Sequence, residues 1–187
     1  PDREGAADKQ VVGLAAADGG KRWVFKELSH LVKIMPAGEG LVAVDGDTGL
    51  THKSMTWVLD PATGAQVFAR SVLGIDCRYD QASVTVCVVV DKWMGAFDQT
   101  SKGWLWEIDG TKDEREIPMI TAIWHGAVYA KTKDNGPVVI DAKTGADRET
   151  NPGLAPFAVN EYLGIAMVDD PATGAGDPVG MAYPVAG

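Results

Sequence analysis

The stretch from Val58 to Phe68, which reads Val-Leu-Asp-Pro-Ala-Thr-Gly-Ala-Gln-Val-Phe, predicts a strand, a tight turn and a second strand. Its first two residues are apolar and suit a pleated strand. Asp60 can then accept hydrogen bonds from the following backbone, and Pro61 presets φ for a turn. Gly64 supplies the positive φ that a reversal of the chain needs. The stretch therefore predicts a β-hairpin.

Weaker copies of this pattern begin at Asp18, Asp98 and Asp141, so that the four aspartates are spaced by 42, 38 and 43 residues. A period near forty residues with strand and turn chemistry indicates propeller blades, each of four short antiparallel strands. No stretch shows the 3.6-residue apolar period of an amphipathic helix. The predicted fold class is all-β, a β-propeller.

These residues also carry a family resemblance. An apolar residue, then Asp-x-x-Thr-Gly, then an aromatic residue resembles the repeat of the PQQ-like (quinoprotein dehydrogenase-like) β-propellers. The best copy is Leu59–Phe68; the copies at Asp18 and Asp98 keep the aromatic residue, and the copy at Asp141 has Glu149 in its place. The resemblance covers nearly the whole chain and implies kinship with secreted or lipid-anchored bacterial propellers, particularly actinobacterial ones. It implies the fold more than the function, because the repeat builds blades and does not itself catalyse.

The sequence divides into a partial blade, three complete blades and a second partial blade. The predicted strands number two in the first segment, four in each of the next three and about three in the last. The segments are residues 11–28, about 30–72, 74–108 and 117–150, and 155–187. The hexapeptide Asp170–Ala175 repeats Asp60–Ala65 letter for letter, but it follows Asp141 by only 29 residues, so we expect it in an inner loop.

The strand count bears on how the propeller closes. A propeller closes when its first and last blades pair, and an open half-ring would expose strand edges and apolar faces. We therefore expect residues 1–187 to be the C-terminal half of a single propeller of roughly seven or eight blades. The expected partners are the remaining blades of the same propeller, encoded before Pro1, or a partner protein.

Composition and charge exclude several classes of partner. The chain has 187 residues, 45% of them hydrophobic, and a net charge of −9 that is spread along its length. Nucleic acids and anionic membrane surfaces need clustered Lys and Arg, so neither is an expected partner. No apolar run approaches the roughly twenty residues of a membrane span, so this segment is not expected to span one.

The two cysteines, Cys77 and Cys87, lie at equal distances from Ala82. If the chain turns about Ala82, they face each other across an antiparallel pair, within reach of a disulfide. The alternative is a pair of buried, reduced thiols that pack as small hydrophobes. We predict the disulfide, which places the chain in an oxidising compartment outside the cytoplasm.

No residue is assigned to catalysis, to a cofactor or to a metal. The alternating carboxylates of Asp45–Gly49 lack the further oxygen ligands of a calcium loop, so this segment is interpreted as a solvated turn. His30, His52 and His125 are far apart in the sequence, without the spacing of a zinc site or a catalytic triad. No phosphate-binding or nucleophile motif occurs.

Most of the six tryptophans are expected between neighbouring blades, where the aromatic residues of this repeat pack. Trp93 is the exception. It follows Asp91 and Lys92 in a predicted loop between strands, where an aromatic residue has less reason to be buried. Trp93 is therefore the one residue predicted to contact a ligand.

These observations favour a non-catalytic binding or scaffold module of the bacterial cell envelope, outside the cytoplasm. One alternative is a PQQ-dependent dehydrogenase, but the resembled enzymes hold PQQ and calcium with a ligand set that we cannot place here. They also often have a vicinal disulfide, and Cys77 and Cys87 are not vicinal. A second alternative is the extracellular sensor of a membrane kinase. No cofactor is predicted.

Overall fold

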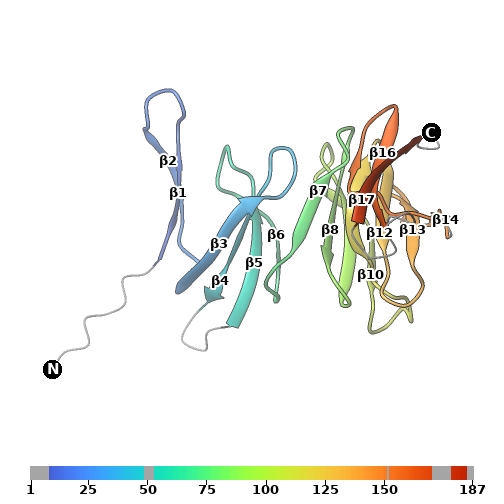
Figure 1. The fold of residues 1–187 in the computed structure, drawn as a ribbon. Coiled ribbons are helices and arrows are strands. Elements are labelled where there is room, and N and C mark those ends of the chain that lie inside the picture. Colours follow the sequence, from blue (N-terminus) through green and yellow to red (C-terminus); the bar gives the residue numbers. More distant parts are fainter. Residues whose placement is uncertain (1–8, 49–52, 151, 170–177, 185–187) are drawn as a thin grey trace. The chain divides into compact units, whose positions relative to one another are not determined.

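The structure, a computed structural model, describes residues 9–48, 53–150, 152–169 and 178–184 (Figure 1). These residues form antiparallel strands and no helix, which confirms the predicted all-β class. Accordingly, none of them belongs to a helix that could cross a membrane. The hexapeptide Asp170–Ala175 lies outside the described residues. The chain forms two compact units, residues 1–77 and 78–187, and each is described by itself.

The first unit contains a two-stranded and a four-stranded antiparallel sheet. The smaller sheet pairs β1 (Val11–Leu14) with β2 (Lys21–Phe25). The larger has the order β3-β4-β5-β6, with β3 (His30–Pro36), β4 (Val42–Thr48), β5 (Lys53–Leu59) and β6 (Gln66–Arg70).

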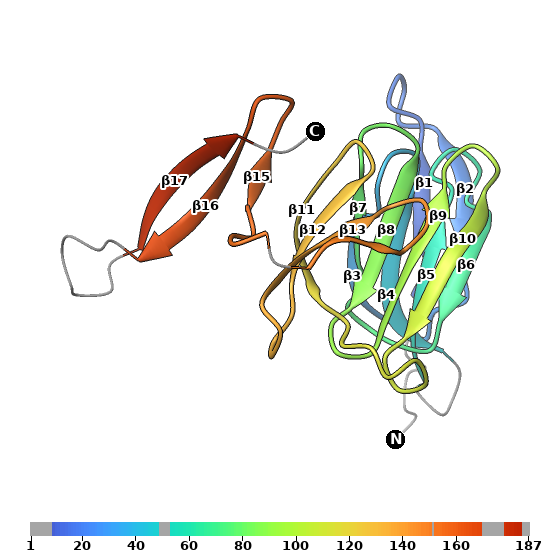
Figure 2. The same ribbon diagram turned by 90° about the vertical axis from the view of Figure 1, so that its right-hand side faces the viewer.

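The remaining strands form three sheets, and the boundary between the units falls within β7. The first sheet joins β7 (Asp76–Tyr79), β8 (Val84–Val89), β9 (Trp93–Asp98) and β10 (Gly103–Asp109) in chain order. The second joins β11 (Met119–Trp124), β12 (Ala127–Lys131), β13 (Pro137–Asp141) and β14 (Asp147–Glu149). The last has three strands, β15 (Ala158–Val159), β16 (Leu163–Asp169) and β17 (Pro178–Pro184), of which β16 and β17 form a long hairpin (Figure 2).

The repeat turn folds as its residue types predict. Asp60 Oδ1 accepts hydrogen bonds from the backbone N of Ala62 at 2.7 Å and of Thr63 at 3.2 Å. Gly64 has a φ of +73°, and its N–H donates to the carbonyl of Asp60 at 2.8 Å. The turn that begins at Asp141 has the same design, so the repeat specifies one local structure twice.

Two tryptophans pack on these turns, one in each unit. Trp23 Nε1 donates to the carbonyl of Pro61 at 2.8 Å, and a Cβ added to Gly64 would lie 2.6 Å from the Trp23 ring. In the second unit Trp106 Nε1 donates to the carbonyl of Ala142 at 2.9 Å, and a Cβ at Gly145 would lie 2.7 Å from the Trp106 ring. The repeat glycine is therefore needed for its positive φ and for the space that it leaves to the indole of another sheet.

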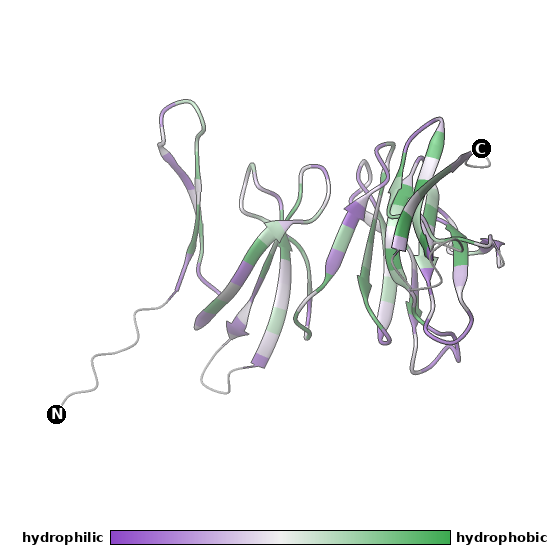
Figure 3. Cartoon of the chain, viewed as in Figure 1, coloured by the Kyte–Doolittle hydropathy of each residue, from purple (hydrophilic) through white to green (hydrophobic). Residues whose placement is uncertain are grey.

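Each unit has its own core. In the first, Phe25 packs edge-to-face on Trp57 at 5.6 Å between ring centroids, within a cluster that includes Val44 and Leu59. In the second, all six residues of β8 are buried, and three of its valines join residues of β9, β11, β12 and β13 in one apolar cluster. The apolar character of β8 is visible in Figure 3.

For Asp45–Thr48 the structure corrects the interpretation as a solvated turn, and Gly49 lies outside the described residues. Strand β4 continues to Thr48, and Asp45 is only 3% exposed. Its Oδ1 accepts the Thr56 hydroxyl, and its Oδ2 accepts the backbone N of Gly74 at 3.0 Å. A carboxylate can be buried in a strand when such hydrogen bonds replace water, so the Asp45 side chain is part of the first unit's interior.

Candidate functional site

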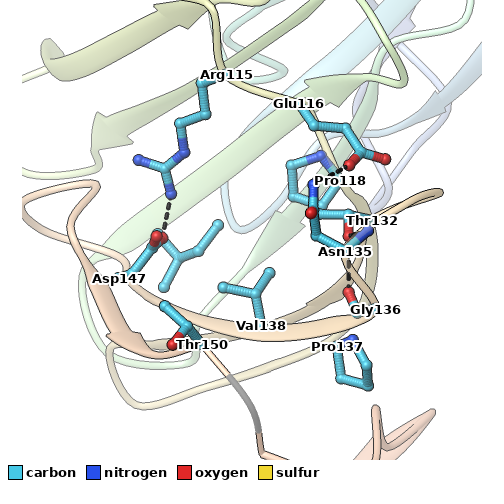
Figure 4. Close-up of a pocket in the computed structure, with 11 residues that line it drawn as sticks. Arg115, Glu116, Pro118, Thr132, Asn135, Gly136, Pro137, Val138, Asp147 and Thr150 are labelled. Atoms are coloured by element: carbon cyan, nitrogen blue, oxygen red, sulfur yellow. Dashed lines mark hydrogen bonds and ion pairs between the residues drawn. The ribbon is translucent and has the colours of Figure 1, made fainter.

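A pocket of about 190 Å³ lies beside the loop between β12 and β13, in the second unit (Figure 4). Its lining residues come from three separate segments: 115–118 before β11, 132–140 in the loop and β13, and 147–150 of the outer strand and its end. Pairing of β11 to β14 in one sheet brings these segments together.

One wall of the pocket is an ion pair between Arg115 and Asp147. Arg115 Nη2 donates to Asp147 Oδ1, and Arg115 Nη1 donates to the carbonyl of Gly145 at 3.1 Å. Gly145 is the glycine of the repeat turn, so the same turn that receives Trp106 also fixes this arginine. Thr150 lies beside Asp147 in Figure 4.

The opposite wall is built around Glu116. Its Oε1 accepts the backbone N of Lys133 and, at 3.1 Å, the backbone N of Asp134, while its Oε2 accepts Asn135 Nδ2 at 2.8 Å. The loop also closes on itself, because Thr132 Oγ1 accepts the backbone N of Asn135 at 3.0 Å. The loop geometry therefore depends on a carboxylate from a different segment.

Opposing effects set the pKa of Glu116. Desolvation, the largest, raises it, and the hydrogen bonds from Asp134, Lys133, Asn135 and Thr132 together lower it below the ordinary value. A hydrogen-bonded carboxylate is favoured in its charged form. Glu116 is therefore ionised at neutral pH.

The pocket has an aliphatic floor. Ile140 is fully buried, Val138 is half-buried, and Pro118 and Pro137 complete the apolar lining. In Figure 4 Val138 lies between the Asp147 wall and the Asn135 wall. Ionic walls around an aliphatic floor suit the binding of a group with an apolar stem and a polar end.

A second pocket of about 330 Å³ adjoins the first at Thr132. It has two exposed apolar residues, Val90 (46% exposed) and Met119 (50% exposed), with the side chains of Lys131 and Lys133 around them. Large apolar side chains that line exposed pockets are typical of protein-binding surfaces. Together the two pockets form one surface around the β12–β13 loop, which we call the loop surface.

The loop surface presents several kinds of polar group. The residues that line it supply carboxylates, ammonium and guanidinium groups, an amide and hydroxyls, but no His and no Cys. Within the described part of the chain, no three His, Cys, Asp or Glu residues are grouped so as to hold a metal ion.

The predicted disulfide is confirmed: Cys77 and Cys87 are disulfide-bonded, on neighbouring strands β7 and β8. The turn between these strands is held by Asp80, whose N–H donates to the carbonyl of Val84 at 2.9 Å. Both cysteines lie outside the loop surface.

Trp93 also lies outside the loop surface. It is the first residue of β9 and not part of a loop, and it is half-buried. Its ring packs edge-to-face on Trp104 at 5.4 Å between centroids, and Trp104 packs in the same manner on Phe97 at 5.6 Å. A ligand contact at Trp93 stays a prediction, and the structure assigns the ring a place in this aromatic cluster.

Sequence reasoning missed the residues of the loop surface. Arg115 and Glu116 lie in a charged segment between two blades, and Asn135-Gly136 is an ordinary turn sequence. The sequence gives one signal here: the polar segment before Ile117 is longer than a tight turn between strands. That signal indicates a loop and does not indicate which residues meet in space.

Comparisons with known proteins bear on the fold. No protein-family model matches the sequence, and no curated protein matches it. Among solved structures, the chain is similar to Sqt1 of Saccharomyces cerevisiae, a WD40 propeller, with a TM-score of 0.52, 11% identity and coverage of 96% of this chain and 53% of Sqt1. It is also similar to the computationally designed protein Ika4, with a TM-score of 0.51, 12% identity and coverage of 82% of this chain and 92% of Ika4.

A third similar structure is BamB from Moraxella catarrhalis, with a TM-score of 0.44, 15% identity and coverage of 97% of this chain and 60% of BamB. The chain thus spans about half the length of Sqt1 and 60% of BamB. At these identities the likeness concerns the fold alone. Four-stranded antiparallel sheets in sequence, together with the likeness to Sqt1, identify the fold of this chain as β-propeller blades.

Proposed function

We propose that this chain is a non-catalytic binding module, a β-propeller that holds a partner protein at the loop surface. The observation that supports this most directly is the pair of pockets that meet at Thr132. An apolar pair, Val90 and Met119, is exposed there beside charged side chains. An apolar centre with a polar rim is the usual anatomy of a protein-binding surface.

The proposed location is outside the cytoplasm, at the bacterial cell envelope. The disulfide between Cys77 and Cys87 supports an oxidising compartment, because cytoplasmic thiols are normally kept reduced. The envelope as the site, and a secreted or lipid-anchored form, rest on the resemblance of the repeat to PQQ-like propellers.

We also propose that all these blades belong to a single propeller of the PQQ-like type. The packing of Trp23 and Trp106 on repeat turns supports the type. The β1–β2 and β15–β17 sheets have two and three strands among the described residues, where the other sheets have four. Strands of the same propeller or of a partner protein would complete them.

The proposal is tested by selecting peptides from a random phage-displayed library on the immobilised protein and measuring their affinities by calorimetry. We expect Met119→Asp to weaken the selected peptides by about tenfold or more, because it places a charge at the apolar centre of the surface. Met167→Asp is the matched control: Met167 is 51% exposed, as Met119 is 50% exposed, but it lies on β16 and lines neither pocket.

Two outcomes would overturn the proposal. One is a selection that yields no peptide of measurable affinity. The other is a set of peptides that Met119→Asp and Met167→Asp affect equally, which would place binding away from the loop surface.

A further inference from the structure

We infer that the pocket between Arg115 and Asn135 receives a cationic side chain, a lysine or an arginine, of the bound protein. This inference rests on the proposed function and specifies the chemistry of its partner. It is supported by the free acceptors of the pocket, its charge, its size and its floor.

Two carboxylates with unused acceptor capacity line the pocket on opposite walls. Glu116 Oε2 accepts one hydrogen bond, from Asn135, and a carboxylate oxygen can accept two. Asp147 accepts Arg115 through Oδ1, and among the described residues no donor reaches its Oδ2. Both groups are therefore able to accept further N–H donors.

The charge of the lining favours a cation over an anion. Arg115 is the one basic residue among those that line this pocket, against the two carboxylates of Glu116 and Asp147. Both terminal nitrogens of Arg115 already donate, to Gly145 and to Asp147. An anionic ligand would thus meet two carboxylates and an engaged guanidinium, and unfavourable juxtaposition of like charges is a strong determinant of specificity.

The size and floor of the pocket favour a single side chain. Its volume of about 190 Å³ is below the roughly 300–1,000 Å³ of pockets that enclose a whole small-molecule ligand. Lys and Arg have long methylene stems that pack on apolar surface while the charged end stays at polar groups. Val138, which lies between the two walls, and Pro118, beside Glu116, offer such a surface.

The charge of the whole chain acts in the same direction. A net charge of −9 attracts cationic partners at a distance and raises their rate of association. At the pocket this attraction becomes specific, because Glu116 and Asp147 stand on opposite walls. The expected partner segment places one Lys or Arg in the pocket, next to an apolar residue that reaches Val90 and Met119.

The test uses the peptides selected on the wild-type protein. We expect them to share a lysine or arginine, and we expect replacement of that residue by norleucine or citrulline to weaken binding at least about tenfold. The same loss should follow from Glu116→Gln and from Asp147→Asn. In a double-mutant cycle, the protein and peptide changes should be coupled and not additive. Asp169→Asn is the control, because it removes the same charge at an exposed residue of β16 that lines neither pocket, and it should bind as the wild type does.

The outcomes separate this inference from the proposed function. Peptides that depend on Met119 but are neutral or acidic, or whose cationic residue shows no coupling to Glu116 or Asp147, would refute the cation site and leave the binding function standing. A selection without any peptide refutes both. Urea unfolding of each variant guards against misfolding, and Asp147→Asn provides an independent result where Glu116→Gln disturbs the loop.

Discussion

The β7–β10 sheet and the β15–β17 sheet are both antiparallel and contain many apolar residues, but the first has a buried central strand and the second has an exposed edge strand. Every residue of β8 is buried, whereas six of the seven residues of β17 are exposed. Three valines of β8 share a core with Ile120 of β11 and Ile140 of β13, and no residue of β17 is buried. Apolar residues alone do not bury a strand, because burial also requires other sheets that cover its faces.

The largest expected difference between the two sheets is the change in unfolding free energy when a methionine of each is replaced by alanine. Met94, on β9, is fully buried in the core of the second unit, and Met181, on β17, is 47% exposed. Met94→Ala should lower the free energy of unfolding by about 2–5 kcal/mol, because it leaves a cavity in a packed core. Met181→Ala should change it by less than about 0.5 kcal/mol. Urea unfolding followed by tryptophan fluorescence measures both.

Equal losses of unfolding free energy for Met94→Ala and Met181→Ala would contradict the difference in burial between β9 and β17. A large loss for Met181→Ala would mean that the face of β17 is covered in solution. Urea unfolding of the wild-type protein at several concentrations would then show whether self-association buries this face.

The second largest expected effect on stability comes from the disulfide. It crosslinks β7 to β8, and no disulfide crosslinks the β15–β17 sheet. The double change Cys77→Ala and Cys87→Ala should cost about 2–3 kcal/mol of unfolding free energy, since the bond restricts the unfolded chain. Alkylation and mass spectrometry of the unreduced wild type provide the control. Two reactive thiols in freshly isolated protein would show that the bond is absent in solution.

The parts of the fold that depend on local sequence can be predicted from it. Within the segment 117–150, strands β11 and β12 are joined by a tight turn at His125-Gly126 between two apolar runs. Within the segment 155–187, the last strand begins at Pro178. Proline and glycine usually end a strand, but both are tolerated where the strand has an exposed edge.

The disulfide and the loop surface show where prediction from sequence ends. Cys77 and Cys87 belong to one hairpin, so their pairing follows from their distance to a single turn. Arg115, Glu116 and Asp147 meet only after the β11–β14 sheet has formed. The burial of Asp45 was missed for a related reason, because its partner Gly74 lies 29 residues away. Contacts of this kind have no signature in a single sequence.

The smallest expected effect concerns the end of β10, where a carboxylate fixes the edge of the buried sheet. Asp109 Oδ1 accepts the hydroxyl of Thr111 at 2.6 Å and its backbone N at 3.0 Å, and Asp109 Oδ2 pairs with Lys112 Nζ at 2.9 Å. These interactions, with the Thr111 hydroxyl first, lower the pKa of Asp109 to about 2.

A carboxylate with a lowered pKa in the folded state contributes stability above its unfolded pKa of about 3.9, and that stability is lost as the pH falls toward 2. Thr111→Val keeps the backbone N–H and removes the hydroxyl, so the pKa of Asp109 should rise toward its ordinary value. Lys112→Met should also raise it, because Lys112 contributes a hydrogen bond and a positive charge. Carbon-13 NMR of the Asp109 carboxyl between pH 5 and 1.5 measures all three proteins. A wild-type midpoint near 4, or an unchanged midpoint in Thr111→Val, would mean that the turn after β10 does not hold Asp109 in this way.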